Sequence, residues 1–121
     1  MKFLIVDDSS TMRRIVINTL TKAGFSEFAE AGNGTEGVDQ LSKSSFDVVI
    51  TDWNMPVMNG LDFVRAIRAK DSTKQVPVLM VTTNAAQDDI LEALKAGVND
   101  YVVKPFTPDV IKAKVQAVTT K

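Results

Sequence analysis

Residues 2–10 have the sequence KFLIVDDSS, an apolar run that ends in two adjacent aspartates. A helix-like pattern begins directly after them. Carboxylates close to a buried strand need a partner that offsets their charge. Asp7 and Asp8 therefore either belong to a solvated turn that caps the next helix or hold a cation. Taken alone, the pattern favours the capped helix, because Asp and Ser are preferred at that position.

Four further apolar runs follow, separated by amphipathic segments. They are EFAEA at 27–31, FDVVI at 46–50, VPVLMV at 76–81 and DYVV at 100–103. Three of the five runs are nearly continuous in Val, Ile and Leu, which is typical of strands buried on both faces of a parallel sheet. The alternation of strand and helix, repeated five times, predicts an open α/β sheet with helices on both faces.

The segments between the runs show helical spacing of apolar residues. The predicted faces are Met12, Ile15, Val16, Thr19 and Leu20 in the first helix, Leu61, Phe63, Val64 and Ile67 in the third, and Ile90, Leu91, Leu94 and Lys95 in the fourth. Gly24, Gly60 and Gly97 fall where turns or helix ends are needed. Thr107 is predicted to cap the last helix, with Pro108 as its first residue.

Composition indicates one globular domain over residues 1–121, with 45% hydrophobic residues and a net charge of −1. This charge gives no reason to expect a nucleic acid or an anionic membrane as partner. The chain contains neither Cys nor His, which excludes disulfides, thiolate catalysis and imidazole catalysis. No apolar run approaches the roughly 20 residues of a membrane span. We therefore expect a soluble cytoplasmic protein.

Polar residues follow the ends of four predicted strands. They are Asp7 and Asp8, then Asp52, then Thr82 and Thr83, and finally Lys104 and Pro105. Parallel strands end along one edge of a sheet, and ligands bind outside that edge. Each residue has an ordinary explanation by itself, as a cap, a turn or a loop. Their joint placement at one edge predicts a functional site.

The three carboxylates predict a metal ion. Two carboxylates about 5 Å apart repel by roughly 3 kcal/mol at an effective dielectric constant of about 20, so three pairs approach about 10 kcal/mol. That energy is comparable to the whole stability of a domain. Oxygen ligands without His or Cys select a hard cation such as Mg²⁺, which can share its coordination shell with a phosphate.

A different site is suggested by GNGTEG at 32–37, which matches the glycine pattern of dinucleotide-binding proteins. It follows the second predicted strand rather than the first, and the nearby acids would repel a pyrophosphate. We therefore interpret Asn33–Gly34 as a turn and a helix start.

Four segments resemble the receiver domain of two-component response regulators: VDDS at 6–9, TDWNMPVMNG at 51–60, VTT at 81–83 and YVVKPF at 101–106. The resemblance covers the whole chain, and within the family it is strongest to single-domain chemotaxis regulators. It implies a flavodoxin-like (βα)5 doubly wound parallel sheet with strand order 2-1-3-4-5. The site would lie between the first and third strands.

The resemblance also implies roles for the acidic residues. Asp52 would accept the phosphoryl group, and Asp8 and Asp52 would ligate Mg²⁺ directly. Asp7 would bind the ion through a water molecule, and Asn54 through its backbone carbonyl.

The remaining site residues follow from the same resemblance. Lys104 would contact the phosphoryl group and Thr82 would hydrogen-bond to it, while Thr83 stands where the family usually has a small residue. The Lys104–Pro105 bond would be a cis peptide. Positions 54 and 84, both Asn here, would tune the lifetime of the aspartyl phosphate.

The implied switch consists of Thr82 and Tyr101, since the phosphate draws the threonine hydroxyl inward and the tyrosine ring takes the vacated space. The alternative for Tyr101 is an ordinary half-buried strand residue. The implied output face comprises Ile90, Leu94, Tyr101, Val103 and Lys114. Apolar residues on a helix are as commonly core as interface, so both interpretations stay open for this face.

The implied function is a phosphorylation-activated switch without an output domain, expected to act as a monomer. A histidine kinase would donate the phosphoryl group, the flagellar motor switch protein would be the target, and a phosphatase is a further partner. The chain would not be an enzyme, except in catalysing its own phosphorylation and dephosphorylation. The alternative is a phosphorelay intermediate or phosphate sink. A haloacid-dehalogenase-type phosphatase is disfavoured, because position 54 is Asn where that family needs a second Asp.

Overall fold

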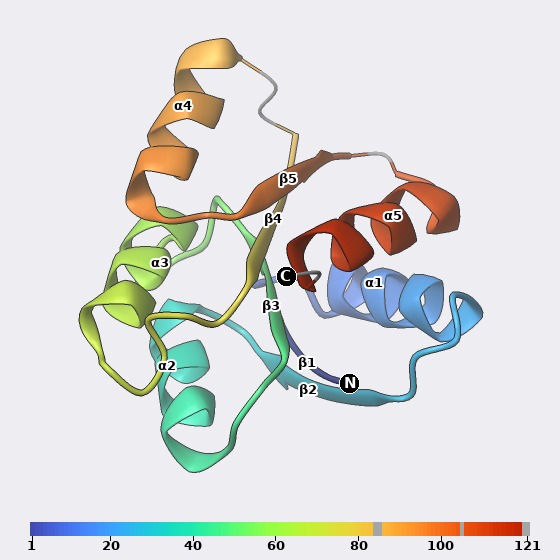
Figure 1. The fold of residues 1–121 in the computed structure, drawn as a ribbon, viewed down its shortest axis with the longest axis horizontal. Helices are drawn as coiled ribbons and strands as arrows, with labels where there is room; N and C mark the ends of the chain where they lie inside the picture. The colour runs from blue at the N-terminus through green and yellow to red at the C-terminus, as the bar shows by residue number, and fades with distance from the viewer. Residues whose placement is uncertain (84–85, 105, 120–121) are drawn as a thin grey trace.

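Five parallel strands form a single sheet in the computed structural model, which describes residues 1–83, 86–104 and 106–119 (Figure 1). The strands are β1 (Lys2–Val6), β2 (Glu27–Ala31), β3 (Val48–Asp52), β4 (Val78–Thr82) and β5 (Asp100–Val103). Their order in the sheet is β2-β1-β3-β4-β5. This order confirms the predicted doubly wound, flavodoxin-like fold, with the chain reversing its direction of winding between β1 and β3.

Helices cover both faces of the sheet. They are α1 (Ser10–Lys22), α2 (Gly34–Lys43), α3 (Gly60–Ala69), α4 (Gln87–Ala96) and α5 (Pro108–Thr119). Figure 1 shows α1 and α5 side by side on one face and α2, α3 and α4 on the other. No helix among the described residues is both long enough and apolar enough to cross a bilayer.

The central strands β1, β3 and β4 are almost fully buried, as the continuous apolar runs predicted. Successive side chains point to opposite faces, so each strand supplies two cores. In β1, Leu4 and Val6 pack into the core beneath α2, α3 and α4, whereas Phe3 and Ile5 pack into the core beneath α1 and α5. Burial on both faces fixes the strand ends, and with them the positions of the residues that follow.

Two strands lie slightly later in the chain than predicted. The predicted ranges 46–50 and 76–81 become Val48–Asp52 and Val78–Thr82. Pro77 has no N–H to donate, and the Asp47 N–H bonds the Lys2 carbonyl at 2.8 Å before the β3 ladder begins. Asp52 and Thr82 are therefore the last residues of their strands rather than the first residues after them.

The predicted helix starts are confirmed at three caps. Ser9 accepts a hydrogen bond from the Met12 N–H at 3.2 Å, and Thr107 accepts one from the Val110 N–H at 3.3 Å. Asn33 caps α2 by accepting from the Glu36 N–H at 2.9 Å. The segment 32–37 is thus a turn and a capped helix start, as interpreted from the sequence.

Part of the predicted helix faces is wrong. Ile15, Leu91 and Leu94 were placed on apolar faces, yet all three side chains are substantially exposed. In α4 the described residue that is buried is Ala93. The small side chain of Ala93 lets α4 lie close to the core, and the larger Leu91 and Leu94 side chains point away from it.

Candidate functional site

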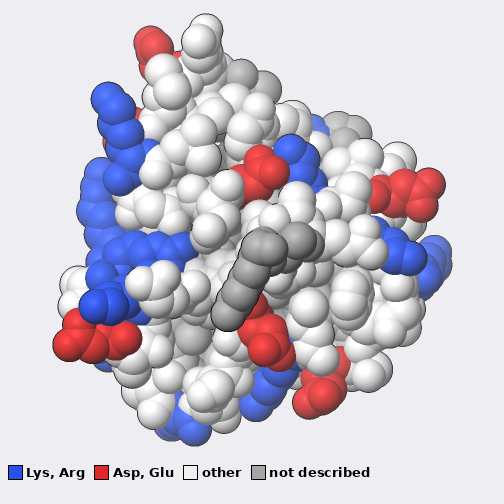
Figure 2. All heavy atoms as spheres, viewed as in Figure 1, with Lys and Arg blue, Asp and Glu red and all other residues white. Residues whose placement is uncertain are grey.

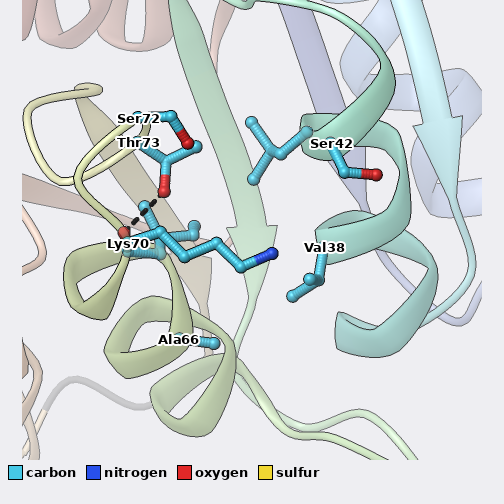
Figure 3. A pocket seen from close by; sticks show the side chains of 8 residues that line it. Val38, Ser42, Ala66, Lys70, Ser72 and Thr73 are labelled. Atoms are coloured by element: carbon cyan, nitrogen blue, oxygen red, sulfur yellow. Dashed lines mark hydrogen bonds between the residues drawn. The ribbon is translucent and has the colours of Figure 1, made fainter.

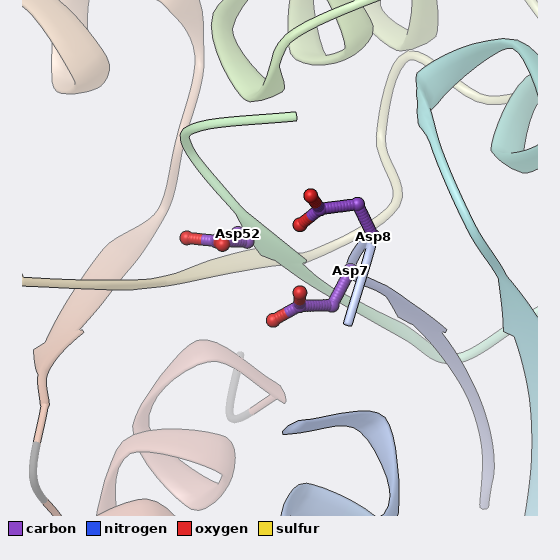
Figure 4. A group of neighbouring side chains, drawn as sticks. All are labelled: Asp7, Asp8 and Asp52. Atoms are coloured by element: carbon purple, nitrogen blue, oxygen red, sulfur yellow. The ribbon is translucent and has the colours of Figure 1, made fainter. Parts of the chain in front are cut away.

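Asp7, Asp8 and Asp52 lie together at the carboxyl edge of the sheet (Figure 4). Strands β1 and β3 are neighbours, with Val6 opposite Thr51, so the residues that end them meet. One carboxylate oxygen from each aspartate lies within 4.8 Å of the others. Asp7 is buried, Asp52 is half-buried and Asp8 is exposed. The structure therefore brings the three predicted acids into one cluster that opens to solvent on the Asp8 side.

Backbone hydrogen bonds orient two of the three carboxylates. The Ser9 N–H donates to Asp7 Oδ1 at 2.9 Å, and the Trp53 N–H donates to Asp52 Oδ1 at 2.7 Å. The Oδ2 atoms of both side chains face Lys104, whose Nζ lies 3.6 Å from each. These separations exceed hydrogen-bond length, so the ammonium neutralises both acids without binding tightly to either. Lys104 can therefore turn toward another anion.

The cluster carries an excess of negative charge, because Lys104 faces three carboxylates. Burial raises the pKa of Asp7, and the neighbouring Asp52 charge and a hydrogen bond with Asp8 raise it further. The Ser9 N–H and Lys104 act in the opposite direction. The net effect is a raised pKa of Asp7, which means that the ionised form of the cluster is unfavourable. A bound cation would lower the energy of that ionised form.

Thr82 and Tyr101 lie on the neighbouring strands β4 and β5. Thr82 is fully buried at the end of β4, and its carbonyl accepts a hydrogen bond from the Lys104 N–H at 2.9 Å. Thr83 is exposed. The Tyr101 ring is half-buried against the core beneath α3 and α4. Asn84 and Pro105, for which the sequence predicted a role in phosphate lifetime and a cis peptide, lie outside the described residues.

A charged contact at Tyr101 was not predicted from the sequence. Lys114 on α5 places its ammonium 5.3 Å from the centre of the Tyr101 ring. The same ammonium lies 3.1 Å from both carboxylate oxygens of Asp100. Asp100 and Lys114 are far apart along the chain, so no local motif signals the pair.

The predicted output residues lie on α4, β5 and α5, which follow one another at the β5 edge of the sheet. Leu94 and Val103 are exposed, while Ile90, Tyr101 and Lys114 are half-buried. Leu94 and Val103 are therefore not core residues, and the interface role of this face stays a prediction.

The loop from Trp53 to Asn59 begins next to Asp52 and is held at several points. The Gly60 N–H donates to the Trp53 carbonyl at 2.7 Å, and the Gly34 N–H donates to the Met58 carbonyl at 3.2 Å. A Cβ atom on Gly60 would lie 2.3 Å from the Asp52 carbonyl oxygen, so only glycine fits there. Asn54 is exposed within this loop.

Val57 has a backbone φ of 69°, in the left-handed region that β-branched residues strongly avoid. We expect Val57→Asn to raise the free energy of unfolding by about 1 kcal/mol, because Asn tolerates this conformation. Urea denaturation would measure the gain. The exposed Val110, in helical conformation on α5, is the control, and Val110→Asn should give no gain. Equal effects at the two positions would contradict strain at Val57.

Two other surface features lie away from the acidic cluster. A cavity of about 190 Å³ between α2 and α3 is lined by Val38, Leu41, Ser42, Ala66, Ile67, Lys70, Ser72 and Thr73, with no carboxylate among them (Figure 3). Figure 2 shows Lys and Arg side chains gathered on the side formed by α3 and α4. Arg68 and Lys95 lie in the last turns of these helices, where their charges complement the helix dipoles.

Comparison with known proteins identifies the family. The family described as "Response regulator receiver domain" matches residues 3–116. The chain belongs to this family. This receiver is 54% identical over 118 residues to chemotaxis protein CheY of Pseudomonas aeruginosa, and the match covers 98% of this chain and 95% of that protein. It is 51% identical to chemotaxis protein CheY1 of Helicobacter pylori over 98% of this chain and 96% of that protein.

Solved receiver structures have the same fold. Chemotaxis protein CheY4 of Vibrio cholerae superposes with a TM-score of 0.89 at 40% identity, covering 97% of both chains. The receiver domain of the sensor histidine kinase PA1611 of Pseudomonas aeruginosa has a TM-score of 0.88 at 28% identity, covering 98% of this chain and 96% of that one. That structure has a magnesium ion coordinated in its active-site cleft.

Proposed function

We propose that this receiver is a phosphorylation-activated signalling switch in which Asp52 accepts the phosphoryl group. The observation that carries the proposal is the position of Asp52: it ends β3 inside the acidic cluster, with Lys104 Nζ 3.6 Å from its Oδ2 atom. Asp52 Oδ1 is held by the Trp53 N–H, whereas Oδ2 receives no backbone hydrogen bond from the described residues. Oδ2 is therefore the atom that we assign as nucleophile.

In the proposed reaction, Asp52 Oδ2 attacks the phosphorus atom of a phosphohistidine in line with the leaving nitrogen. A P–O bond forms, the P–N bond breaks, and the imidazole leaves with the electron pair of that bond. Lys104 lies beside the new phosphoryl oxygens and compensates their charge. The donor must be another protein, since this chain has no His. Water attack on the aspartyl phosphate then resets the switch.

The acidic cluster fits Mg²⁺, because its donors are all oxygen atoms and three carboxylates converge on one small volume. We propose that Asp8, Asp52 and the backbone carbonyl of Asn54 ligate the ion and that Asp7 holds one of its waters. When bound, the ion would neutralise charge on the carboxylates and on the phosphoryl oxygens. Asp7 suits the water-mediated role because it is the buried member of the cluster, whereas Asp8 and Asp52 lie closer to solvent.

Mg²⁺ affinity should depend on pH through Asp7. Its pKa is raised by burial, so protonation begins at a higher pH than for a free aspartate and competes with the cation. We expect the affinity to fall as pH is lowered through this raised pKa. The fluorescence of Trp53, whose N–H bonds Asp52, would report binding. A flat titration at neutral pH would contradict the metal site.

The Asp7→Asn variant separates binding from folding. A raised pKa means that the folded state binds the proton more tightly than the unfolded state, so without metal stability falls as pH rises through the folded pKa. Asp7→Asn should therefore bind Mg²⁺ more weakly, yet be more stable than the parent in metal-free buffer at neutral pH, by about 1 kcal/mol. Asp62→Asn, at an exposed position on α3, is the control.

For the output step, we propose that Thr82 hydrogen-bonds the phosphoryl group and that Tyr101 responds by changing its ring position. The surface formed by Ile90, Leu94, Tyr101, Val103 and Lys114 would then bind the flagellar motor switch protein. The names of the chemotaxis relatives, at 50% identity and above over nearly the full chain, support this target over other partners. A phosphatase and a chemotaxis histidine kinase complete the proposed set of partners.

Acetyl phosphate with Mg²⁺ tests the switch itself. We expect one phosphate per chain that is stable in acid and released by hydroxylamine, as for an acyl phosphate. A peptide from the N-terminus of a flagellar motor switch protein should then bind the phosphorylated protein at least about tenfold more tightly than the unphosphorylated one. Labelling without any phosphate-dependent binding would instead favour the phosphorelay or phosphate-sink function.

A further inference from the structure

Val57 combines a strained backbone with an exposed apolar side chain. Its backbone lies in the left-handed region at φ 69°, which costs a β-branched residue about 1–2 kcal/mol. Its side chain is 83% exposed, so this apolar group contributes almost nothing to packing. Among the described residues no other non-glycine residue has a positive φ.

The strained backbone is imposed by the neighbours of Val57, but the valine side chain is not. The Met58 N–H donates to the Pro56 carbonyl at 2.7 Å across Val57, which closes a three-residue turn. The Met58 carbonyl in turn accepts from the Gly34 N–H on α2. These contacts fix the conformation whatever residue occupies the position, and Gly or Asn would adopt it at lower cost. Folding therefore gives no reason for valine here.

The position of this loop suggests the reason. The loop starts at Trp53, directly after Asp52, and returns beside it, because the Gly60 N–H bonds the Trp53 carbonyl. The side chains of Asp52 and Lys104 are only 14% and 15% exposed. A donor protein must therefore bring its phosphohistidine down to recessed groups, and its surface must rest on the loops around them. Val57 is an exposed apolar side chain on one of these loops.

We propose that Val57 is a docking contact for the protein that carries the phosphohistidine and adds affinity for that protein alone. This inference rests on the proposed function of Asp52. An apolar side chain on a rigid loop loses little conformational freedom when a partner covers it, which makes the contact efficient. A small phosphodonor would never touch it.

Two donors with the same P–N bond but different size test the proposal. One is monophosphoimidazole, and the other is the isolated phosphohistidine domain of a chemotaxis histidine kinase. We expect Val57→Asn to lower the second-order rate constant of phosphotransfer from the domain about tenfold, through the lost apolar contact. Labelling by monophosphoimidazole should be unchanged. Val57→Ile, which keeps an apolar side chain and the same strain, should transfer at close to the parent rate.

Leu91→Asn is the control, since it removes another exposed apolar side chain, on α4 and outside the proposed binding surfaces, and should leave both rates unchanged. Equal losses with both donors would show that Val57 shapes the acceptor site and would overturn the docking role. The role is also wrong if Val57→Asn changes neither rate, or if the parent protein accepts phosphate from monophosphoimidazole but not from the domain. Failure of the parent with both donors would instead contradict Asp52 as acceptor.

Discussion

Replacing Asp52 with Asn is expected to abolish labelling by acetyl phosphate, with at least a ~100-fold loss in incorporated phosphate. The amide lacks the anionic oxygen that attacks phosphorus, and Asp7 and Asp8 follow β1 rather than β3, so neither occupies the place of Asp52 beside the Trp53 N–H (Figure 4). The assay is incorporation of ³²P from labelled acetyl phosphate in the presence of Mg²⁺. Unfolding cannot explain the loss, since removing one of three clustered charges should stabilise the metal-free fold.

The exposed Asp47 provides the matched control. It directly precedes β3, at the end of the strand opposite to Asp52. Its Oδ2 atom accepts a hydrogen bond from the Lys2 N–H at 2.7 Å. Asp47→Asn should be labelled like the parent protein. If Asp52→Asn incorporates phosphate as well as the parent does, the acceptor is a different residue, and peptide mapping of the labelled protein would identify it.

Replacing Arg68 with Met should lower the free energy of unfolding by about 3 kcal/mol, the largest stability effect that we expect from one surface-reaching side chain. The guanidinium donates to the carbonyls of Gly97 at 2.8 Å and Val76 at 2.6 Å. It also donates to the Lys74 carbonyl at 3.0 Å and to Asn99 Oδ1 at 2.8 Å. Met keeps the apolar stem but leaves these acceptors without their donor.

The lowered pKa of Arg68 agrees with this structural role, because burial is its cause. Arg65 is the control, since it lies three residues earlier on the same helix and makes one exposed ion pair with Asp62 at 3.2 Å. Arg65→Met should change stability by no more than about 0.5 kcal/mol in urea denaturation. Similar losses for the two variants would show that the buried hydrogen bonds of Arg68 contribute little.

The sequence was sufficient to predict the fold and the acidic cluster, for one physical reason. Strands buried on both faces have nearly continuous apolar sequences, which can be recognised without a structure. In a parallel sheet the ligand-binding residues lie at the carboxyl ends of these strands. Asp7, Asp8 and Asp52 each stand at such an end, so their meeting required no knowledge of packing. The starts of β3 and β4 were predicted two residues too early, at 46 and 76 rather than at Val48 and Val78, because apolar content alone does not show where the ladder begins.

Features that depend on distant contacts could not be predicted. Ile15 and Leu94 have helical apolar spacing, but their exposure depends on how much of each helix the sheet covers. The hydrogen-bond partners of Arg68 lie in the α3–β4 and α4–β5 connections. None of them is acidic, so a pattern of opposite charges in the sequence does not predict these contacts. The positive φ of Val57 is imposed by hydrogen bonds of its neighbours. Valine is a residue that avoids this conformation, so its presence in the sequence would not lead to the prediction of a positive φ.

The contacts of Arg68 also have a consequence for the mechanics of α4. Arg68 donates hydrogen bonds to the carbonyl of Gly97, the residue directly after α4. At the other end of the helix, Ala86 supplies no side-chain cap. Ala93, near the end of the helix, is its described buried residue. The two ends of α4 therefore differ in how firmly they are held. Its last turn is anchored to the body of the domain, and its first turn, at the carboxyl edge of the sheet, is the compliant end that a change beside Thr82 can displace at low energy.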